Sequence, residues 1–239
     1  MWRVALLLFA GCGRLGFAPE ASPDASGARP ELVQVRTTRD SDVNGTTVNL
    51  APTRAGGLIA IATLSQNIGG TAESVVSIVD DAQNNYVFAG ARALWNGDDG
   101  AVEVWYAASA RPGARVVRIF STGNTSRVAW ALELANMERT APLEGVGQID
   151  DQPSTGRGML AAPMVGVSGV AVVISLVMVN GNVTQVGADN PFVLLPVING
   201  DAAAYAIVDA PGSYGAIFDA PGSGNYAAVT AAFRGLAAD

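Results

Sequence analysis

Residues 160–179 read LAAPMVGVSGVAVVISLVMV, twenty residues without a charge, which is the length of a membrane-spanning helix. Pro163 and two glycines interrupt the first half, and valine dominates the second. β-Branched residues favour strands, whereas proline and glycine weaken the interior of a helix. The stretch therefore predicts a deeply buried strand over residues 170–179, ended by the Asn-Gly-Asn turn at residues 180–182.

The rest of the chain from residue 31 reads as short strands separated by turn residues. Residues 57–64 form a nearly continuous apolar run, which predicts another strand covered on both faces. Asn44-Gly45 is a strong hairpin dipeptide and predicts a hairpin between strands at residues 32–38 and 46–50. Further strands are expected at residues 74–79, 86–88, 93–95, 101–107, 114–121 and 127–135.

Two segments leave alternatives open. Residues 131–139 are the best helix candidate, because Ala, Leu, Glu and Met favour helices, but the alternation that begins at Val128 favours a strand. Residues 136–158 contain two prolines, four glycines and an Asp pair, and they predict a break. This break is either a long excursion between two halves of one sandwich or a domain boundary.

A short repeat marks the tail of the chain. Asp-Ala-Pro-Gly-Ser occurs at residues 209–213 and again at 219–223. Pro-Gly suits type II turns, so the tail predicts a meander of three strands joined by two similar turns. Strands at this spacing predict an all-β fold, an antiparallel β-sandwich that is jelly-roll-like, in a single domain over residues 31–239.

The N-terminus has the pattern of a secretory signal. Arg3 is followed by an apolar run, then by Ala10 and Gly11, then by Cys12, the only cysteine. A small-residue cleavage site before cysteine resembles the lipobox of bacterial lipoproteins. The resemblance implies a signal peptide over residues 1–11 and a lipid on Cys12 that anchors the protein to a membrane. Pro, Ala, Ser and Gly dominate the segment that follows, which predicts a flexible tether over residues 12–30. An ordinary cleaved signal and a membrane-spanning anchor are the alternatives.

The residue after the cysteine is relevant to localisation. Gly13 stands where lipoproteins retained at the inner membrane carry Asp, so the resemblance implies the cell envelope, at the outer membrane, or an extracellular position.

Composition excludes several kinds of chemistry. The chain has no histidine and one cysteine, so Ser-His-Asp and Cys-His catalysis and structural zinc or iron–sulfur sites are excluded. The net charge is −7 and every basic residue is arginine. Nucleic acids are bound through basic patches, so we expect no nucleic-acid partner.

A Ca²⁺ site is the candidate metal site. Residues 77–86, SIVDDAQNNY, resemble a segment that recurs in secreted bacterial β-sandwich modules. Asp80, Asp81 and Asn84 supply the oxygen ligands that Ca²⁺ prefers, and the Asp pairs at residues 98–99 and 150–151 are similar candidates. The alternative is that Asp80 and Asn84 hydrogen-bond the backbone of a tight turn.

Strand alternation places Glu103 and Trp105 on one face, and Glu133 projects from another strand. Two facing carboxylates could hydrolyse a glycosidic bond. Exposed aromatic residues, Trp105 and Trp95 above all, could stack on sugar rings, although core packing is the alternative for each. The aromatic candidates are Trp95, Trp105, Tyr106, Tyr205, Tyr214 and Tyr226.

Because composition excludes so much catalysis, we expect a non-enzymatic binding or adhesion protein, with polysaccharide or a surface protein as its partner. A purely structural envelope protein and a carboxylate-based glycoside hydrolase are the alternatives.

Overall fold

The computed structural model describes residues 28–67, 70, 74–155, 158–188 and 190–236, and within them it contains strands and no helix. The predicted antiparallel β-sandwich is confirmed. Cys12, the expected signal peptide and most of the expected tether lie outside the described residues. The end of that tether contacts the body, because the Arg29 guanidinium donates to the Asp209 carboxylate at 2.7 Å and 3.0 Å.

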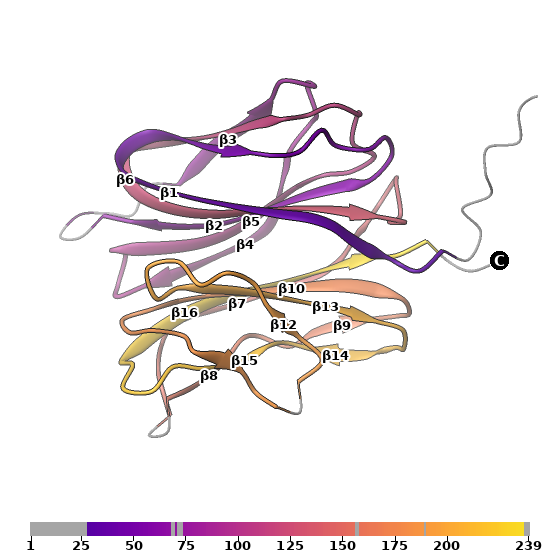
Figure 1. Ribbon diagram of the computed structural model, residues 1–239. Helices are drawn as coiled ribbons and strands as arrows, with labels where there is room; N and C mark the ends of the chain where they lie inside the picture. The colour runs from indigo at the N-terminus through magenta and orange to yellow at the C-terminus, as the bar shows by residue number, and fades with distance from the viewer. Residues whose placement is uncertain (1–27, 68–69, 71–73, 156–157, 189, 237–239) are drawn as a thin grey trace, which may run out of the picture.

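The first half of the chain builds one six-stranded sheet, drawn in indigo to magenta in Figure 1. Its order is β1-β6-β2-β5-β4, with β3 also paired to β6. The strands are β1 (Glu31–Asn49), β2 (Leu58–Gln66), β3 (Val75–Asp80), β4 (Val87–Trp95), β5 (Gly100–Ala107) and β6 (Val116–Ala135).

The second half builds a five-stranded sheet, β12-β13-β10-β16-β7, and two small sheets, β11-β15-β8 and β14-β9. The strands are β7 (Leu143–Pro153), β8 (Met159–Ala161), β9 (Val165–Val167), β10 (Ala171–Val179), β11 (Gln185–Val186), β12 (Val193–Leu194), β13 (Ala202–Val208), β14 (Gly212–Tyr214), β15 (Ile217–Asp219) and β16 (Asn225–Arg234).

Three hydrophobic clusters separate these layers in the described chain. The central cluster lies between the two large sheets, and alternate residues of β10, such as Val172 and Ile174, point into it. The intervening residues, such as Val173 and Val177, point into a second cluster beneath the small sheets. The prediction of a strand buried on both faces is therefore confirmed for β10, and it also holds for β2, whose residues divide between the central cluster and a third one.

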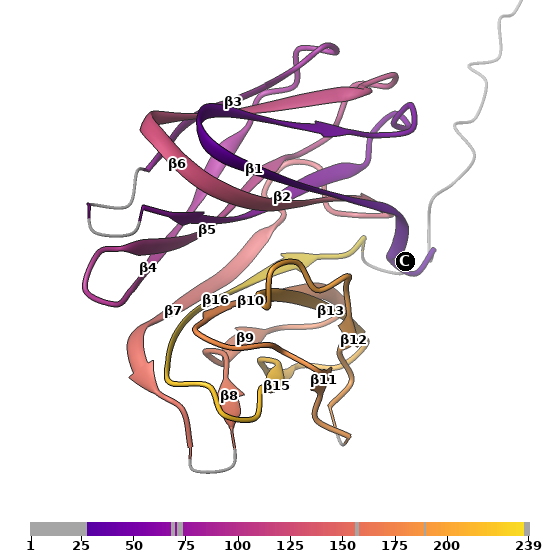
Figure 2. The same ribbon diagram turned by 60° about the vertical axis from the view of Figure 1, so that its left-hand side comes forward.

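The hairpin predicted at Asn44-Gly45 is wrong. β1 is one long strand that pairs with β6 along its whole length, and residues 40–45 form bulged register shifts instead of a turn. A bulge bends a strand and increases its twist. As Figure 2 shows, β1 and β6 curl together, so that their outer halves and β3 cover the far face of β2 and β5. The third cluster fills the space under this cover.

The structure also decides between the helix and the strand expected at residues 131–139. β6 continues as a strand to Ala135, and Met137 makes an isolated antiparallel bridge with Gly235. The strand prediction is confirmed and the helix candidate is wrong. The large buried side chains on alternate positions, including Trp130 and Leu132, explain why the sheet outweighs the helix propensity of this segment.

The meander predicted in the tail is also wrong. The tail does form strands, but β10 lies between β13 and β16, and β14 and β15 pair with β9 and β8 in the small sheets. The Pro-Gly dipeptides predicted where the chain turns. Which strands pair with each other depends instead on which apolar faces become buried.

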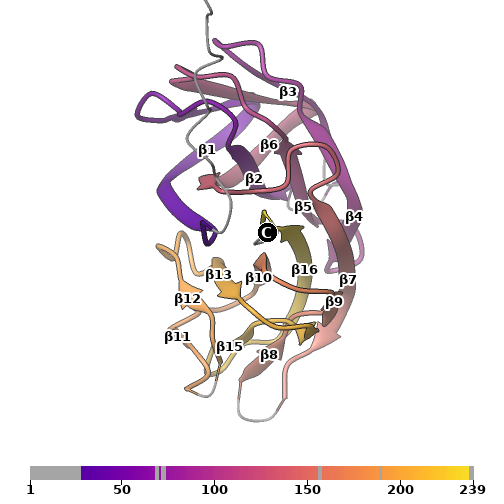
Figure 3. The same cartoon turned by 90° about the vertical axis from the view of Figure 1, so that its right-hand side faces the viewer.

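The predicted break at residues 136–158 contains a strand. β7 is the edge strand of the five-stranded sheet and runs beside β4, the edge strand of the other sheet, as Figure 3 shows. Side chains of β7 take the place of a neighbouring strand for β4: Gln148 Oε1 accepts from the Arg92 N–H at 2.9 Å, and Asp150 Oδ1 accepts from the Leu94 N–H at 2.8 Å. These bonds close one side of the sandwich.

Candidate functional site

The face of β5 that carries Glu103 and Trp105 is covered. Alternation does place both side chains on one face, as predicted, but the curled halves of β1 and β6 and strand β3 lie over it. Glu103 is only 3% exposed. Trp105 packs against the third cluster with its ring centroid 5.3 Å from that of Phe88. The exposed groove expected from Glu103 and Trp105 is therefore corrected to a buried polar layer.

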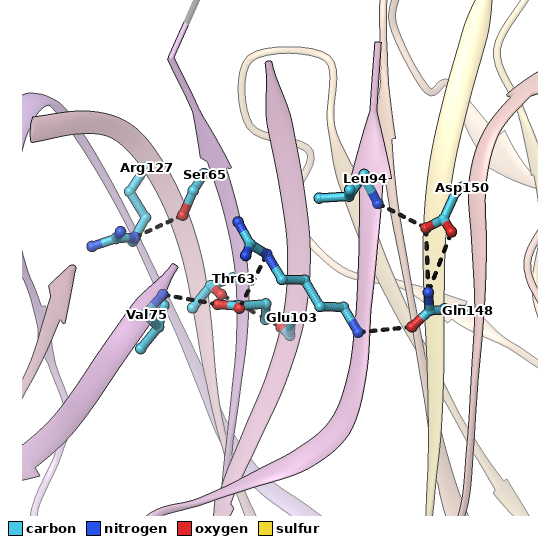
Figure 4. Close-up of polar contacts among 9 residues, drawn as sticks. Thr63, Ser65, Val75, Leu94, Glu103, Arg127, Gln148 and Asp150 are labelled. Atoms are coloured by element: carbon cyan, nitrogen blue, oxygen red, sulfur yellow. Dashed lines mark hydrogen bonds and ion pairs between the residues drawn. The ribbon is translucent and has the colours of Figure 1, made fainter. Parts of the chain in front are cut away.

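Glu103 lies at the centre of a buried row of polar side chains that crosses four strands, shown in Figure 4. Its Oε2 accepts from the Val75 N–H at 3.1 Å, and its Oε1 lies 3.6 Å from Arg92 Nε. Burial raises the pKa of Glu103, while the Val75 N–H and the positive charges of Arg92 and Arg127 act in the opposite direction.

Arg127 ends this row on β6. The side chain is 1% exposed, and its Nε donates to Ser65 Oγ at 3.1 Å. Its two terminal nitrogens, Nη1 and Nη2, are buried without a hydrogen-bond partner among the described residues. Burial lowers the pKa of Arg127, and the negative charges of Glu103 and Asp40 oppose that shift. The row is a structural charge cluster in which Glu103 compensates two arginines.

The two glutamates do not face each other. Glu103 is opposite Thr63 on one edge of β2, whereas Glu133 is opposite Ile59 on the other edge. This register separates their backbones by about 13 Å along β2 and about 10 Å across it. Glu133 is occupied elsewhere, because Oε1 accepts from the Arg54 N–H and Oε2 from Gln34 Nε2, each at 2.6 Å. No carboxylate pair for glycoside hydrolysis forms from these two residues.

The Asp80 segment is built as a tight turn. Asp80 Oδ1 accepts from the N–H groups of Ala82 and Asn84, both at 3.0 Å. Its Oδ2 accepts from Asn84 Nδ2 at 2.7 Å and from the Tyr86 hydroxyl at 2.9 Å. These four bonds give a structural reason for the Asp, Asn and Tyr spacing seen in the sequence.

Asp81 and Asn84 each also accept from backbone donors through one side-chain oxygen. Asp81 Oδ1 accepts from the N–H groups of Arg115 and Val116, and Asn84 Oδ1 from that of Arg111. These backbone bonds hold the pKa of Asp81 below its usual value. Within the described ranges, no group of three or more Asp, Glu, Cys or His residues could hold a metal ion.

Trp95 borders a polar pocket that sequence reasoning did not find. The pocket encloses about 150 Å³ at the mouth between the two large sheets, where β2, β4 and β10 end and β13 begins. We name it the inter-sheet pocket. It is lined by Gln66, Trp95, Met178, Val179, Asn180, Gly181, Asn199 and Asp201.

Two Asn-Gly turns form one wall of this pocket. Asn180-Gly181 follows β10, and Asn199-Gly200 precedes β13. Gly200 has φ of +91°, and a Cβ there would collide with the Gly181 carbonyl oxygen. The close approach of the two turns therefore requires glycine at position 200. The only signal in the sequence was the pair of Asn-Gly dipeptides, which predicts turns but not their contact.

Asp201 is the one charged side chain in the pocket lining. It is 6% exposed, and its Oδ1 accepts from the Val179 N–H at 3.0 Å. Its Oδ2 has no hydrogen-bond partner among the described residues. Burial raises the pKa of Asp201 to about 7, although the Val179 N–H and the charge of Arg39 favour the ionised form.

The indole of Trp95 is held in place from the opposite sheet. Its Nε1 donates to the Asn225 carbonyl at 3.1 Å, and its half-buried ring packs against the central cluster. Among the aromatic candidates, Tyr106 and Tyr205 also pack against the central cluster, whereas Tyr214 and Tyr226 contact the second one. Trp95 is thus the predicted binding residue that lines the inter-sheet pocket together with side-chain amides and a carboxylate.

A second hollow has different chemistry. It encloses about 350 Å³ among the loops around the small sheets, and its lining is largely apolar, with Met164 and Ile217 exposed. We name it the methionine pocket. It shares no lining residue with the inter-sheet pocket.

No family model, curated protein or solved structure matches this chain. The part of the chain that the structure describes holds no helix long and apolar enough to cross a membrane.

Proposed function

We propose that this protein is a tethered, non-enzymatic binding protein of the cell envelope whose inter-sheet pocket recognises a polysaccharide. One observation carries the proposal: Trp95, three side-chain amides and the Asp201 carboxylate line a single polar pocket. Sugar rings present apolar C–H faces that pack on an indole and hydroxyl groups that bond to amides and carboxylates. The combination therefore matches the chemistry of a sugar better than that of an apolar ligand.

The size of the pocket limits what it holds. Its volume of about 150 Å³ is the liquid volume of about five water molecules. Complete small-molecule sites are larger, usually about 300 Å³ or more. The pocket thus takes one ring or one substituent of a chain, and the rest of the polysaccharide extends over the surface.

The proposed location depends on the N-terminal pattern. The sequence that ends at Cys12 supports a lipid anchor, which makes the membrane a partner through that lipid. The expected tether over residues 12–30 would serve as the spacer between this lipid and the folded domain. We place the protein at the outer membrane or on the extracellular side of it.

A panel of polysaccharides and the thermal midpoint of the full chain test the proposal. A ligand that binds only the folded state adds about 2.7 kcal/mol of stability at a hundredfold excess over its Kd. We expect one polysaccharide class to raise the midpoint, and we expect Asn180→Ala and Asn199→Gly to abolish the rise. Both residues are exposed, and Gly accepts the positive φ of Asn199, so both variants should fold.

Met164→Ala is the matched control, because Met164 lines the methionine pocket and not the inter-sheet pocket, so this variant should leave the rise intact. Trp95→Ala supports the result only if the variant keeps its fold. A flat midpoint with every polysaccharide would contradict the proposal and favour the purely structural envelope protein.

A further inference from the structure

We propose that the inter-sheet pocket selects a positively charged amino group of its ligand, with Asp201 Oδ2 as the partner, so that the polysaccharide is one that contains amino sugars. This inference rests on the proposed function, because it names the class of sugar that the same pocket takes. It goes further in assigning one atom of the chain to the discrimination between sugars.

The geometry of Asp201 carries the proposal. Asp201 is only 6% exposed, and the hydrogen bond from the Val179 N–H to Oδ1 holds its carboxyl group in place. This bond holds Oδ1, whereas Oδ2 has no hydrogen-bond partner among the described residues, and Asp201 lines the pocket. Burying a carboxylate without a partner is unfavourable, and an ammonium group supplies both the opposite charge and three hydrogen-bond donors.

Asp201 has no ion-pair partner among the described residues. Arg39 of β1 is the cation whose charge reaches Asp201, and the two side chains form no ion pair within 4.0 Å in the described residues. The other lining residues are neutral. A uronic acid would place a second carboxylate beside Asp201, whereas a neutral sugar would offer only hydroxyl groups. An ammonium group is the substituent that gains most from this site.

Chitosan and chitin oligomers of equal length provide the test, since N-acetylation removes the positive charge and keeps the ring. Binding of the full chain at pH 6.5 is measured by calorimetry. We expect chitosan to bind at least about tenfold more tightly than chitin, as a charge-assisted hydrogen bond implies. In Asp201→Asn, which keeps an acceptor for the Val179 N–H, chitosan should weaken to the level of chitin.

The outcomes separate the two proposals. Equal affinity for both oligomers would overturn the amino-sugar inference and leave the polysaccharide function standing. Binding of other polysaccharides but of neither oligomer would have the same meaning. Absence of binding across the whole panel would overturn the proposed function itself. A midpoint that Ca²⁺ raises in the wild type but not in Asp201→Asn, and that no sugar raises, would instead make Asp201 a metal ligand and contradict both proposals.

Discussion

Glu103 stabilises the six-stranded sheet as the buried carboxylate whose charge interacts with both Arg92 and Arg127. We expect Glu103→Leu to lower the free energy of unfolding by about 3–5 kcal/mol, because removing one partner leaves buried charges uncompensated. Urea denaturation measures the change. Glu31→Gln is the control, since Glu31 is exposed and should change stability by no more than about 0.5 kcal/mol.

The double variant Glu103→Leu/Arg127→Leu separates charge compensation from packing. Arg127 already lacks hydrogen-bond partners for both terminal nitrogens among the described residues. Removing both charges should therefore recover part of the loss caused by Glu103→Leu alone. If the double variant is less stable than the single one, the buried charges are not the source of the effect.

At the level of the elements, the contact between the two Asn-Gly turns makes position 200 intolerant of a side chain. We expect Gly200→Ala to destabilise the fold at least about 1 kcal/mol more than Gly222→Ala. Both glycines have positive φ, of +91° and +76°, so both variants carry the backbone strain of about 1–3 kcal/mol. Only position 200 adds a collision with backbone, because nothing lies within 4 Å of a Cβ at position 222.

Thermal and urea unfolding of the two alanine variants measure that difference. Equal destabilisation would mean that the turns separate easily and that the wall of the inter-sheet pocket is adaptable.

The edge between β4 and β7 is a second case in which two elements are held together by specific side chains. There, Gln148 and Asp150 accept bonds from an edge strand that would otherwise be open to pairing with another chain.

For the whole molecule, Asp201 makes stability depend on pH in the direction opposite to that of most carboxylates. Its pKa is about 7 in the folded state and about 3.9 in an unfolded chain. The folded state therefore binds the proton more tightly, and stability falls as pH rises from about 4 to about 7. The loss approaches roughly 4 kcal/mol, at 1.36 kcal/mol for each pH unit of difference.

Urea unfolding of the wild type and of Asp201→Asn between pH 4 and pH 8 measures this loss. The variant should lack that part of the slope. Exposed Asp81 and Glu138 have lowered pKa values and contribute the opposite slope in both proteins, so the difference between the two curves isolates Asp201. Parallel curves would show that Asp201 is not buried in its acidic form.

Local patterns in the sequence predicted the strands well. The charge-free run at residues 170–179 predicted β10, because a strand covered on both faces needs apolar residues at every position. The strands expected at residues 93–95 and 101–107 likewise correspond to the end of β4 and to β5, which pair with each other. The hydrogen bonds of the Asp80 turn agree with the turn alternative proposed from sequence, because their donors lie within six residues of Asp80.

The sequence by itself determined the all-β class, the buried strands, the exclusion of histidine and cysteine chemistry, and the expectation of a lipid anchor at Cys12. Only the tertiary structure decided that the face carrying Glu103 is buried, that the tail strands join different sheets, and that Trp95 and Asp201 line one pocket. The physical reason is the separation along the chain over which each kind of interaction acts. Propensity and alternation act between neighbours in the chain, whereas Trp95 and Asp201 line one pocket only because two sheets built from opposite halves of the chain pack on one apolar core.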